Sequence, residues 1–373
     1  MRVAPGTALG PVLLTLSVSA ACAHLHAREV SGPRRLDRVS PQARAELLRR
    51  ATVWRPTRIA EMDLFRGPQG KDGFDPDQQV TCDYVTPDKP LTGHTPKFLC
   101  DLGGGDVAKV KYNSGEVYAE VAASRLLWAL GFGADRDYPV QVTCRNCPIE
   151  PWFWSSERKV EEKRYQTATI QRRLDGKDIE TRDDEGWAWP ELDVVDERAG
   201  GASRDQRDGL KLLAVFLQHS DSKPSNQRFV CLPGGVVKDE AGHEDCKAPF
   251  LYVHDVGLTF GKATLLNNTR VDLQAWRSQP MWKDPGQCVA NMKKSLSGSL
   301  ADPRIGEGGR RFLADLLAQL SDAQIRDMFR AARFERLEER IRAAEGERLV
   351  TLDDWVEVFK HKRGEIVSRK CPP

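Results

Sequence analysis

Four charged segments follow one another along this chain, and their order constrains the fold more than any other feature. A strand-like stretch carries Lys109 and Lys111, and the helix-like stretch after it carries Glu120. A leucine-rich helix then leads into HSDSKPSN, residues 219–226, and an apolar strand runs into Asp255. Groups this far apart in sequence form one polar site only where separate elements meet. We therefore treat the four segments together as one candidate site.

Each segment also has an ordinary structural explanation. Lysines on a strand beside a turn usually lie on a solvated face, and a helical glutamate such as Glu120 is usually exposed. HSDSKPSN is rich in Ser, Asp, Asn and Pro, which favour turns for local reasons. The combination favours chemistry, because phosphoryl transfer needs a cation on the phosphates, an acid that holds this cation, metal ligands and a carboxylate near the incoming hydroxyl.

HSDSKPSN resembles the protein-kinase catalytic loop H-R-D-x-K-P-x-N, with the same spacing of its His, Asp, Lys and Asn. Asp255-Val256-Gly257 resembles the kinase D-F-G, and the AKVK that ends at Lys111 resembles V-A-I-K. The resemblance covers roughly residues 78–330. It implies an α+β, two-lobed protein-kinase-like fold, in which a strand-rich N-lobe with one long helix precedes a mainly helical C-lobe.

Turn and capping signals divide the chain in the same way. We expect strands at 78–85, 96–102, 106–112, 138–144 and 165–174, helices at 41–54 and 116–131, and mostly helix after Asp175. Asn113 and Glu116 have the spacing of a capping pair. The expected parts are a signal peptide at 1–23, an N-terminal extension with a short helix at 24–77, the N-lobe at 78–174 and the C-lobe at 175–373.

The resemblance implies a nucleotide-binding role for the first segments. Lys111 would contact the phosphates of ATP, and Glu120 would pair with Lys111 from the helix. Lys109 is the rival lysine, because alternate residues of a strand share a face. Residues 171–180 would form the hinge between the lobes, where adenine would bond to the backbone.

The resemblance also assigns the chemical step. Asp221 would accept or orient the proton of the acceptor hydroxyl, and Lys223 would contact the transferring phosphate. Asn226 and Asp255 would hold Mg²⁺ through oxygen, with Mn²⁺ as the alternative cation. His219 would be a structural strut of the loop.

The chain departs from ordinary kinases in several places. No G-x-G-x-x-G precedes Lys111, no A-P-E follows Asp255, and the gap from Asn226 to Asp255 is long. These departures resemble divergent members such as the HipA-type, spore-coat and secretory-pathway kinases. The implied function is an exported kinase-like phosphotransferase that uses Mg-ATP to modify a hydroxyl on a protein or small molecule. The alternative is a secreted pseudokinase-like binding module without transfer activity.

The N-terminus predicts export to a periplasmic or extracellular space. Arg2 precedes a short apolar run that ends in small residues, which is the layout of a secretory signal. Cys22 offers an alternative as the lipid-bearing cysteine of a lipoprotein. No stretch reaches the length of a transmembrane span, and a net charge of +2 implies no nucleic-acid partner.

Eight cysteines remain after Cys22, an even number that predicts disulfides in an exported chain. Local sequence favours the pairs Cys82–Cys100, Cys231–Cys246, Cys144–Cys147 and, by elimination, Cys288–Cys371. One alternative is a zinc site made of Cys144, Cys147, His243 and Cys246. A second is a redox centre at the Cys144-x-x-Cys147 motif.

Overall fold

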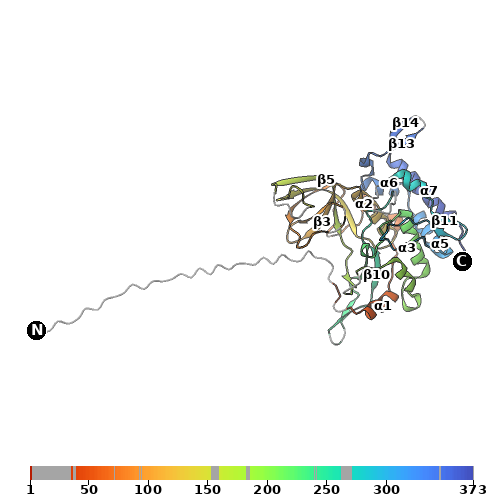
Figure 1. Cartoon of the computed structure of the whole chain (residues 1–373), viewed down its shortest axis with the longest axis horizontal. Coiled ribbons are helices and arrows are strands. Elements are labelled where there is room, and N and C mark those ends of the chain that lie inside the picture. Colours follow the sequence, from red (N-terminus) through yellow and green to blue (C-terminus); the bar gives the residue numbers. More distant parts are fainter. Residues whose placement is uncertain are drawn as a thin grey trace.

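The chain combines helices with strands, as the expected α+β class requires (Figure 1). Residues 2–34, which hold Cys22 and almost all of the expected signal peptide, lie outside the described residues. No helix in the described part has the length and apolar character needed to cross a membrane. The computed structural model describes residues 1, 35–36, 39–70, 72–91, 93, 95–152, 159–181, 185–238, 240, 242–261, 271–343 and 346–372.

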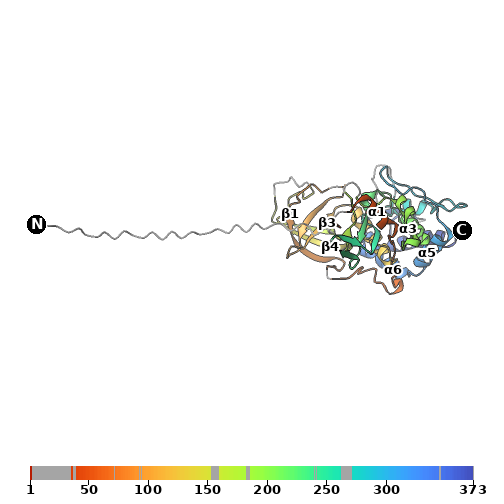
Figure 2. The ribbon, with the colours of Figure 1, turned by 90° about the horizontal axis from the view of Figure 1, so that it is seen from below.

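The strand-rich half is a closed five-stranded barrel, which lies apart from most of the helices (Figures 1 and 2). Neighbouring strands are antiparallel, except that the first and fourth strands close the barrel in parallel. Around the barrel the order is β1 (Gln78–Val85), β2 (Lys97–Asp101), β3 (Val107–Tyr112), β5 (Glu162–Arg172) and β4 (Arg136–Arg145).

Alternation along the strands separates an apolar barrel interior from a polar face. Phe98, Val110 and Ile170 are fully buried in one core with other inward residues of the barrel. Lys109 and Lys111 lie on either side of Val110 in β3, so both project from the opposite face, as expected of alternate residues. The two lysines predicted for the site therefore share one face of the sheet.

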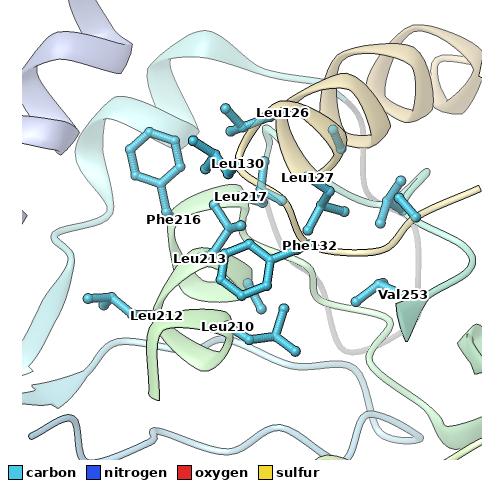
Figure 3. Packing of buried hydrophobic residues seen from close by; sticks show 14 of the residues in the cluster. Leu126, Leu127, Leu130, Phe132, Leu210, Leu212, Leu213, Phe216, Leu217 and Val253 are labelled. Atoms are coloured by element: carbon cyan, nitrogen blue, oxygen red, sulfur yellow. The ribbon is translucent and has the colours of Figure 1, made fainter. Parts of the chain in front are cut away.

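Helix α2 (Glu116–Ala129) joins the barrel to the helical half of the molecule. On the barrel side, the Thr169 hydroxyl of β5 donates to the carbonyl of Val117 over 3.3 Å. On the other side, Leu126 and Leu127 pack in the same cluster as the leucines of α3 (Arg204–Leu217) and Phe132 (Figure 3). Because α2 is buried on both sides, its side chains are held in place relative to both halves.

Among its described residues, the second half contains five helices and more strands than expected. The helices are α3, α4 (Leu273–Ser278), α5 (Glu307–Ala318), α6 (Asp322–Ala331) and α7 (Leu352–Val367). A three-stranded sheet has the order β10 (Pro249–Val253), β7 (Gln227–Cys231) and β6 (Lys177–Asp178). The hairpins are β8 (Val236–Lys238) with β9 (Glu244–Cys246), β11 (Trp282–Asp284) with β12 (Val289–Ala290), and β13 (Arg340–Ala343) with β14 (Gly346–Leu349).

Two helix boundaries differ from expectation. Helix α1 (Pro41–Arg49) ends five residues before the expected Trp54, because Thr52 instead pairs with Phe250 of β10. Helix α2 has Gly115 at its N-cap, so Asn113 and Glu116 do not form a capping pair. The short 3₁₀ turns are η1 (Ile59–Glu61), η2 (Trp189–Val194), η3 (Glu197–Ala199), η4 (Pro224–Asn226) and η5 (Phe334–Leu337).

The structure contains all four favoured disulfides. The Cα atoms of each pair are 5.5 to 5.7 Å apart, within the usual range for a disulfide. Cys144 bonds to Cys147 and Cys246 bonds to Cys231, so the zinc alternative, which needs these thiols as ligands, is wrong.

We expect the Cys82–Cys100 bridge to stabilise the barrel measurably. It closes a separation of 18 residues between β1 and β2, which corresponds to about 3 kcal/mol on the chain-entropy model. The test variant is Cys82→Ala/Cys100→Ala, because both positions are buried and serine would place a hydroxyl there. Its urea midpoint should fall accordingly in equilibrium unfolding. An unchanged midpoint with an unchanged slope would contradict this expectation.

Candidate functional site

The first part of the site is a buried ion pair between β3 and α2. The Lys111 ammonium lies against a carboxylate oxygen of Glu120, and both side chains are almost fully buried, at 2% and 0% exposure. Burial alone would lower the pKa of Lys111, but the charges of Asp255, Glu120 and Asp137 outweigh it and raise this pKa. Lys111 is therefore a permanent cation, and the ion pair joins the barrel sheet to the helix.

Asp255 lies two residues after the end of β10, beside this pair. The backbone N–H groups of His254 and Asp255 both donate to the Asn226 carbonyl, over 2.8 and 3.1 Å. Two residues on, a Cβ on Gly257 would come within 3.0 Å of Glu116 and 3.2 Å of a Glu120 oxygen. A larger residue would therefore be crowded where the Asp-Val-Gly segment crosses α2, and this close approach places Asp255 between the ion pair and Asn226.

Asp255 remains ionised in this position. Burial opposes its charge, but Lys111, His254 and Lys109 outweigh burial and hold the pKa of Asp255 below its usual value. One carboxylate oxygen accepts from the Gly257 N–H over 3.3 Å. Within the described part of the chain, no cation lies within 4.0 Å of this carboxylate. Asp255 thus presents a negative charge that a metal ion could neutralise.

The loop 219–226 is built around Asp221. The Asn226 amide nitrogen donates to the carbonyl of Asp221 over 2.7 Å and to its carboxylate over 3.0 Å. The Lys223 ammonium donates to the same carboxylate oxygen over 3.0 Å. Because the amide nitrogen of Asn226 is used in this way, its oxygen is the atom left to face a cation.

His219 is part of the support of this loop. It is fully buried, and burial lowers its pKa to about 4, so the imidazole is neutral near pH 7. Its ring packs 6.2 Å from that of Trp189, and its Nε2 lies 3.5 Å from the amide of Gln227. These contacts agree with the expected role of a strut.

The donor set suits magnesium better than a metal held by protein alone. Among the described residues, no group of three or more His, Cys, Asp or Glu could hold a metal ion. Mg²⁺ commonly uses one or two carboxylates together with phosphates and water. Asp255 and the Asn226 oxygen fit this pattern, and they would need a phosphate ligand to complete it.

Lys97 is a site residue that the sequence did not reveal. It lies on β2 directly opposite Lys111, and residues opposite one another share a face of the sheet. Its side chain is buried, and its ammonium lies 5.4 Å from the centre of the Trp152 ring. Burial and the charge of Lys111 lower the pKa of Lys97. Lys97 therefore places a second buried ammonium beside that of Lys111.

Lys109 takes part in a second polar group on the same face. Its ammonium donates to the side-chain oxygen of Gln171 over 2.6 Å, and burial together with two lysines lowers its pKa to about 8. Asp137 lies opposite Gln171 on β4, and neither of its buried oxygens has a hydrogen bond from any described residue. Burial raises the pKa of Asp137 to about 7. Lys109 therefore bonds to Gln171, and Glu120 remains the partner of Lys111.

The predicted hinge 171–180 connects the two halves of the molecule. It begins at the end of β5 and includes β6, which pairs with β7. The Leu174 N–H donates to Asp135 over 3.3 Å, and Asp135 also contacts the His254 ring nitrogen at 2.6 Å. The residue before Asp255 is thus linked to the hinge through one buried carboxylate.

Two serines from a distant segment also reach Asp221. The hydroxyls of Ser295 and Ser297 donate to the second carboxylate oxygen of Asp221 over 3.3 and 3.4 Å. They lie 74 and 76 residues away in sequence, so no local pattern could have identified them.

The larger cavities of the described structure lie elsewhere. Five cavities have volumes between about 190 and 640 Å³. None of them is lined by Lys111, Asp221 or Asp255. One of them, of about 540 Å³, borders Leu174 and Asp175 of the predicted hinge. None of these five cavities therefore opens onto the polar cluster.

No family model matches this chain, and no curated protein matches it significantly. Among solved structures it is similar to the crystal structure of CtkA, a proinflammatory kinase of Helicobacter pylori. The TM-score is 0.40 and the identity 10%, over 79% of this chain and 95% of that one. A similarity at this level carries no weight for fold or function.

Proposed function

We propose that this protein is an exported, kinase-like phosphotransferase that uses Mg-ATP to modify a hydroxyl group. One observation carries the proposal. A buried Lys111–Glu120 pair, the ionised Asp255 and the Asp221–Asn226 loop belong to one cluster, linked through the Asn226 carbonyl and the close approach of Gly257. Four disulfides support the exported part of the proposal, because such bridges persist in oxidising compartments.

Each group has one task in binding. Lys111, which Glu120 holds in place, neutralises phosphate charge, and Lys97 adds a second cation where the chain lacks a glycine-rich loop. Asp255 and the Asn226 oxygen would hold the Mg²⁺ ion that accompanies the phosphates. These contacts make nucleotide binding dependent on the metal, because Asp255 would otherwise repel the phosphates.

The chemical step depends on Asp221 and Lys223. Mg-ATP supplies the phosphoryl group and an ADP leaving group. Asp221 holds the acceptor hydroxyl by its proton and removes that proton as the oxygen attacks. Lys223, 3.0 Å from the same carboxylate, stabilises the negative charge on the phosphoryl oxygens during transfer.

A second candidate is a secreted binding module that lacks transfer activity. The burial of the ion pair favours it, because the side chains of Lys111 and Glu120 are 2% and 0% exposed, and none of the five cavities opens onto Lys111. The Lys109–Gln171 pair also occupies part of the face on which a nucleotide would lie. Metal-dependent nucleotide binding without any transfer to hydroxyl acceptors would select this candidate.

We expect Mg-ATP to stabilise the purified protein. At about 100 times the dissociation constant the gain is about 2.7 kcal/mol, which is visible in a melting curve. Asp255→Ala should abolish the shift, and Lys97→Met should weaken binding by about tenfold or more, since a charge-assisted contact is worth about 1.5–3 kcal/mol. Asp245→Ala, which removes an exposed carboxylate from a distant hairpin, is the matched control. A flat titration with adenine and guanine nucleotides, in Mg²⁺ and in Mn²⁺, would rule out both candidates.

A further inference from the structure

Residues 295–300 form a segment that is fastened onto the loop carrying Asp221. The Ser295 N–H donates to the Ser220 carbonyl over 2.9 Å, and the Ser299 N–H donates to the Ser222 carbonyl over 3.0 Å. The Leu300 N–H donates to the Ser222 hydroxyl over 3.1 Å. These bonds fix the position of the segment relative to Asp221 at both of its ends.

A tight turn between these anchors brings Ser297 to the carboxylate. The Gly298 N–H donates to the Ser295 carbonyl over 3.1 Å. A Cβ on Gly298 would lie 2.9 Å from the Ser222 hydroxyl and 3.0 Å from the Ser220 carbonyl, so a larger residue here would have to shift the neighbouring loop. The turn leaves Leu296 74% exposed at its tip.

Three serines alternate through the segment, and only one combines exposure with contact to Asp221. Ser295 contacts Asp221 but is 1% exposed. The Ser299 hydroxyl donates to the Ser222 carbonyl over 2.7 Å and accepts from the backbone N–H of Trp189. Both bonds hold the segment in place, so this hydroxyl has a structural role. Ser297 is exposed, and its hydroxyl donates to Asp221 over 3.4 Å. Its oxygen can therefore be approached from outside while its proton already faces a carboxylate.

We infer that Ser297 is a phosphoryl acceptor within this chain, an inference that rests on the proposed function. The Ser297 oxygen attacks the terminal phosphorus of Mg-ATP, and an O–P bond forms. The bond from that phosphorus to the bridging oxygen breaks, and ADP leaves with its electron pair. The hydroxyl proton passes to Asp221 and then to water. The substrate class at this site is a serine side chain, supplied by the enzyme's own segment.

Modification would change the contacts of the turn. A phosphoserine carries about −1.5 to −2 charges at pH 7, and such a group next to a carboxylate is repelled. Phosphorylated Ser297 would therefore leave Asp221 and move its turn outward, where the neighbouring Lys293 and Lys294 offer positive charge. The acceptor position beside Asp221 would then be open to another hydroxyl.

The test is site-resolved mass spectrometry of the full protein after incubation with Mg-ATP. Trypsin releases residues 295–304 as one peptide with all three serines, so fragmentation must assign the phosphate. We expect one phosphate on Ser297. Ser297→Ala should remove it, whereas Ser299→Ala should keep it, and Asp221→Asn should slow its appearance by about 10²–10⁴-fold. The rate should not depend on protein concentration, and an Asp221→Asn chain mixed with wild type should stay unmodified.

The outcomes separate this inference from the proposed function. If the protein phosphorylates an added acceptor but its own phosphate maps elsewhere or is absent, the assignment of Ser297 is wrong and the function stands. The same holds if Ser297→Ala gains as much phosphate as wild type. Labelling of the Asp221→Asn chain by wild type would overturn transfer within one chain. If neither nucleotide binding nor transfer occurs, both proposals fail.

Discussion

Asp221→Asn should reduce phosphoryl transfer by about 10²–10⁴-fold, the usual contribution of a positioned acid–base group. Asparagine keeps the size of the side chain and one acceptor oxygen, but it cannot take a proton from a hydroxyl. The measurement is transfer of labelled phosphate from Mg-ATP to the protein itself and to secreted-protein extracts. If the variant transfers phosphate as fast as wild type, the role of Asp221 in transfer is refuted, even if the fold is kinase-like.

The same variant should still bind nucleotide. Asp221 accepts from Lys223 and Asn226 on one oxygen and from two serines on the other, so replacing it weakens neutral or charge-assisted bonds worth about 1–3 kcal/mol. Asp255→Asn provides the comparison, because it removes a metal-facing charge and should abolish the Mg-ATP stabilisation directly. Loss of activity together with loss of binding in Asp221→Asn would indicate a structural role instead.

Lys111→Met should destabilise the folded protein by about 3–5 kcal/mol, because it leaves the Glu120 carboxylate without its partner in a buried site. One oxygen of Glu120 already lacks a hydrogen bond from the described residues. Without the Lys111 ammonium, the other oxygen would lose its charged partner as well. Equilibrium denaturation in urea measures the loss. A midpoint equal to that of wild type would show that this ion pair does not hold β3 to α2.

Lys109→Met is the matched control for that experiment. It removes a lysine from the same strand face, but one whose partner is the neutral Gln171 and whose pKa is already lowered to about 8. We expect a cost of only about 0.5–1.5 kcal/mol, that of one ordinary hydrogen bond. The double variant Lys111→Met/Glu120→Leu should recover part of the stability, since apolar residues often replace a buried ion pair without loss.

Much of this site could be predicted because its residues lie at regular positions within local patterns. Strand alternation placed Lys109 and Lys111 on one face, whereas the pairing of Glu120 with Lys111 was implied by the resemblance to protein kinases. Cysteine spacing favoured three bridges that close short excursions, and elimination left Cys288–Cys371 as the fourth. These inferences depend on local geometry, which a sequence carries in its periodicity and turn residues.

The remaining features depend on register and on contacts between distant segments. Lys97 faces Lys111 only because of the pairing between β2 and β3, which no single strand reveals. Closure of the barrel by a parallel β1–β4 pair, and the end of α1 at Arg49, both follow from tertiary partners. Ser297 reaches Asp221 across 76 residues, and its segment carries no signal beyond small polar residues.

The Cys288–Cys371 bridge determines what happens to this protein after proteolytic cleavage. It links a point just before the Ser297 segment to the C-terminal segment that follows α7, across 83 residues. A protease that cuts the exposed Lys293 peptide bond would therefore release no fragment, because both pieces stay joined through the bridge. Such a nicked molecule would migrate as one species until it is reduced. In an environment rich in proteases, the part of the chain that contacts Asp221 could be cut while α5, α6 and α7 stay attached.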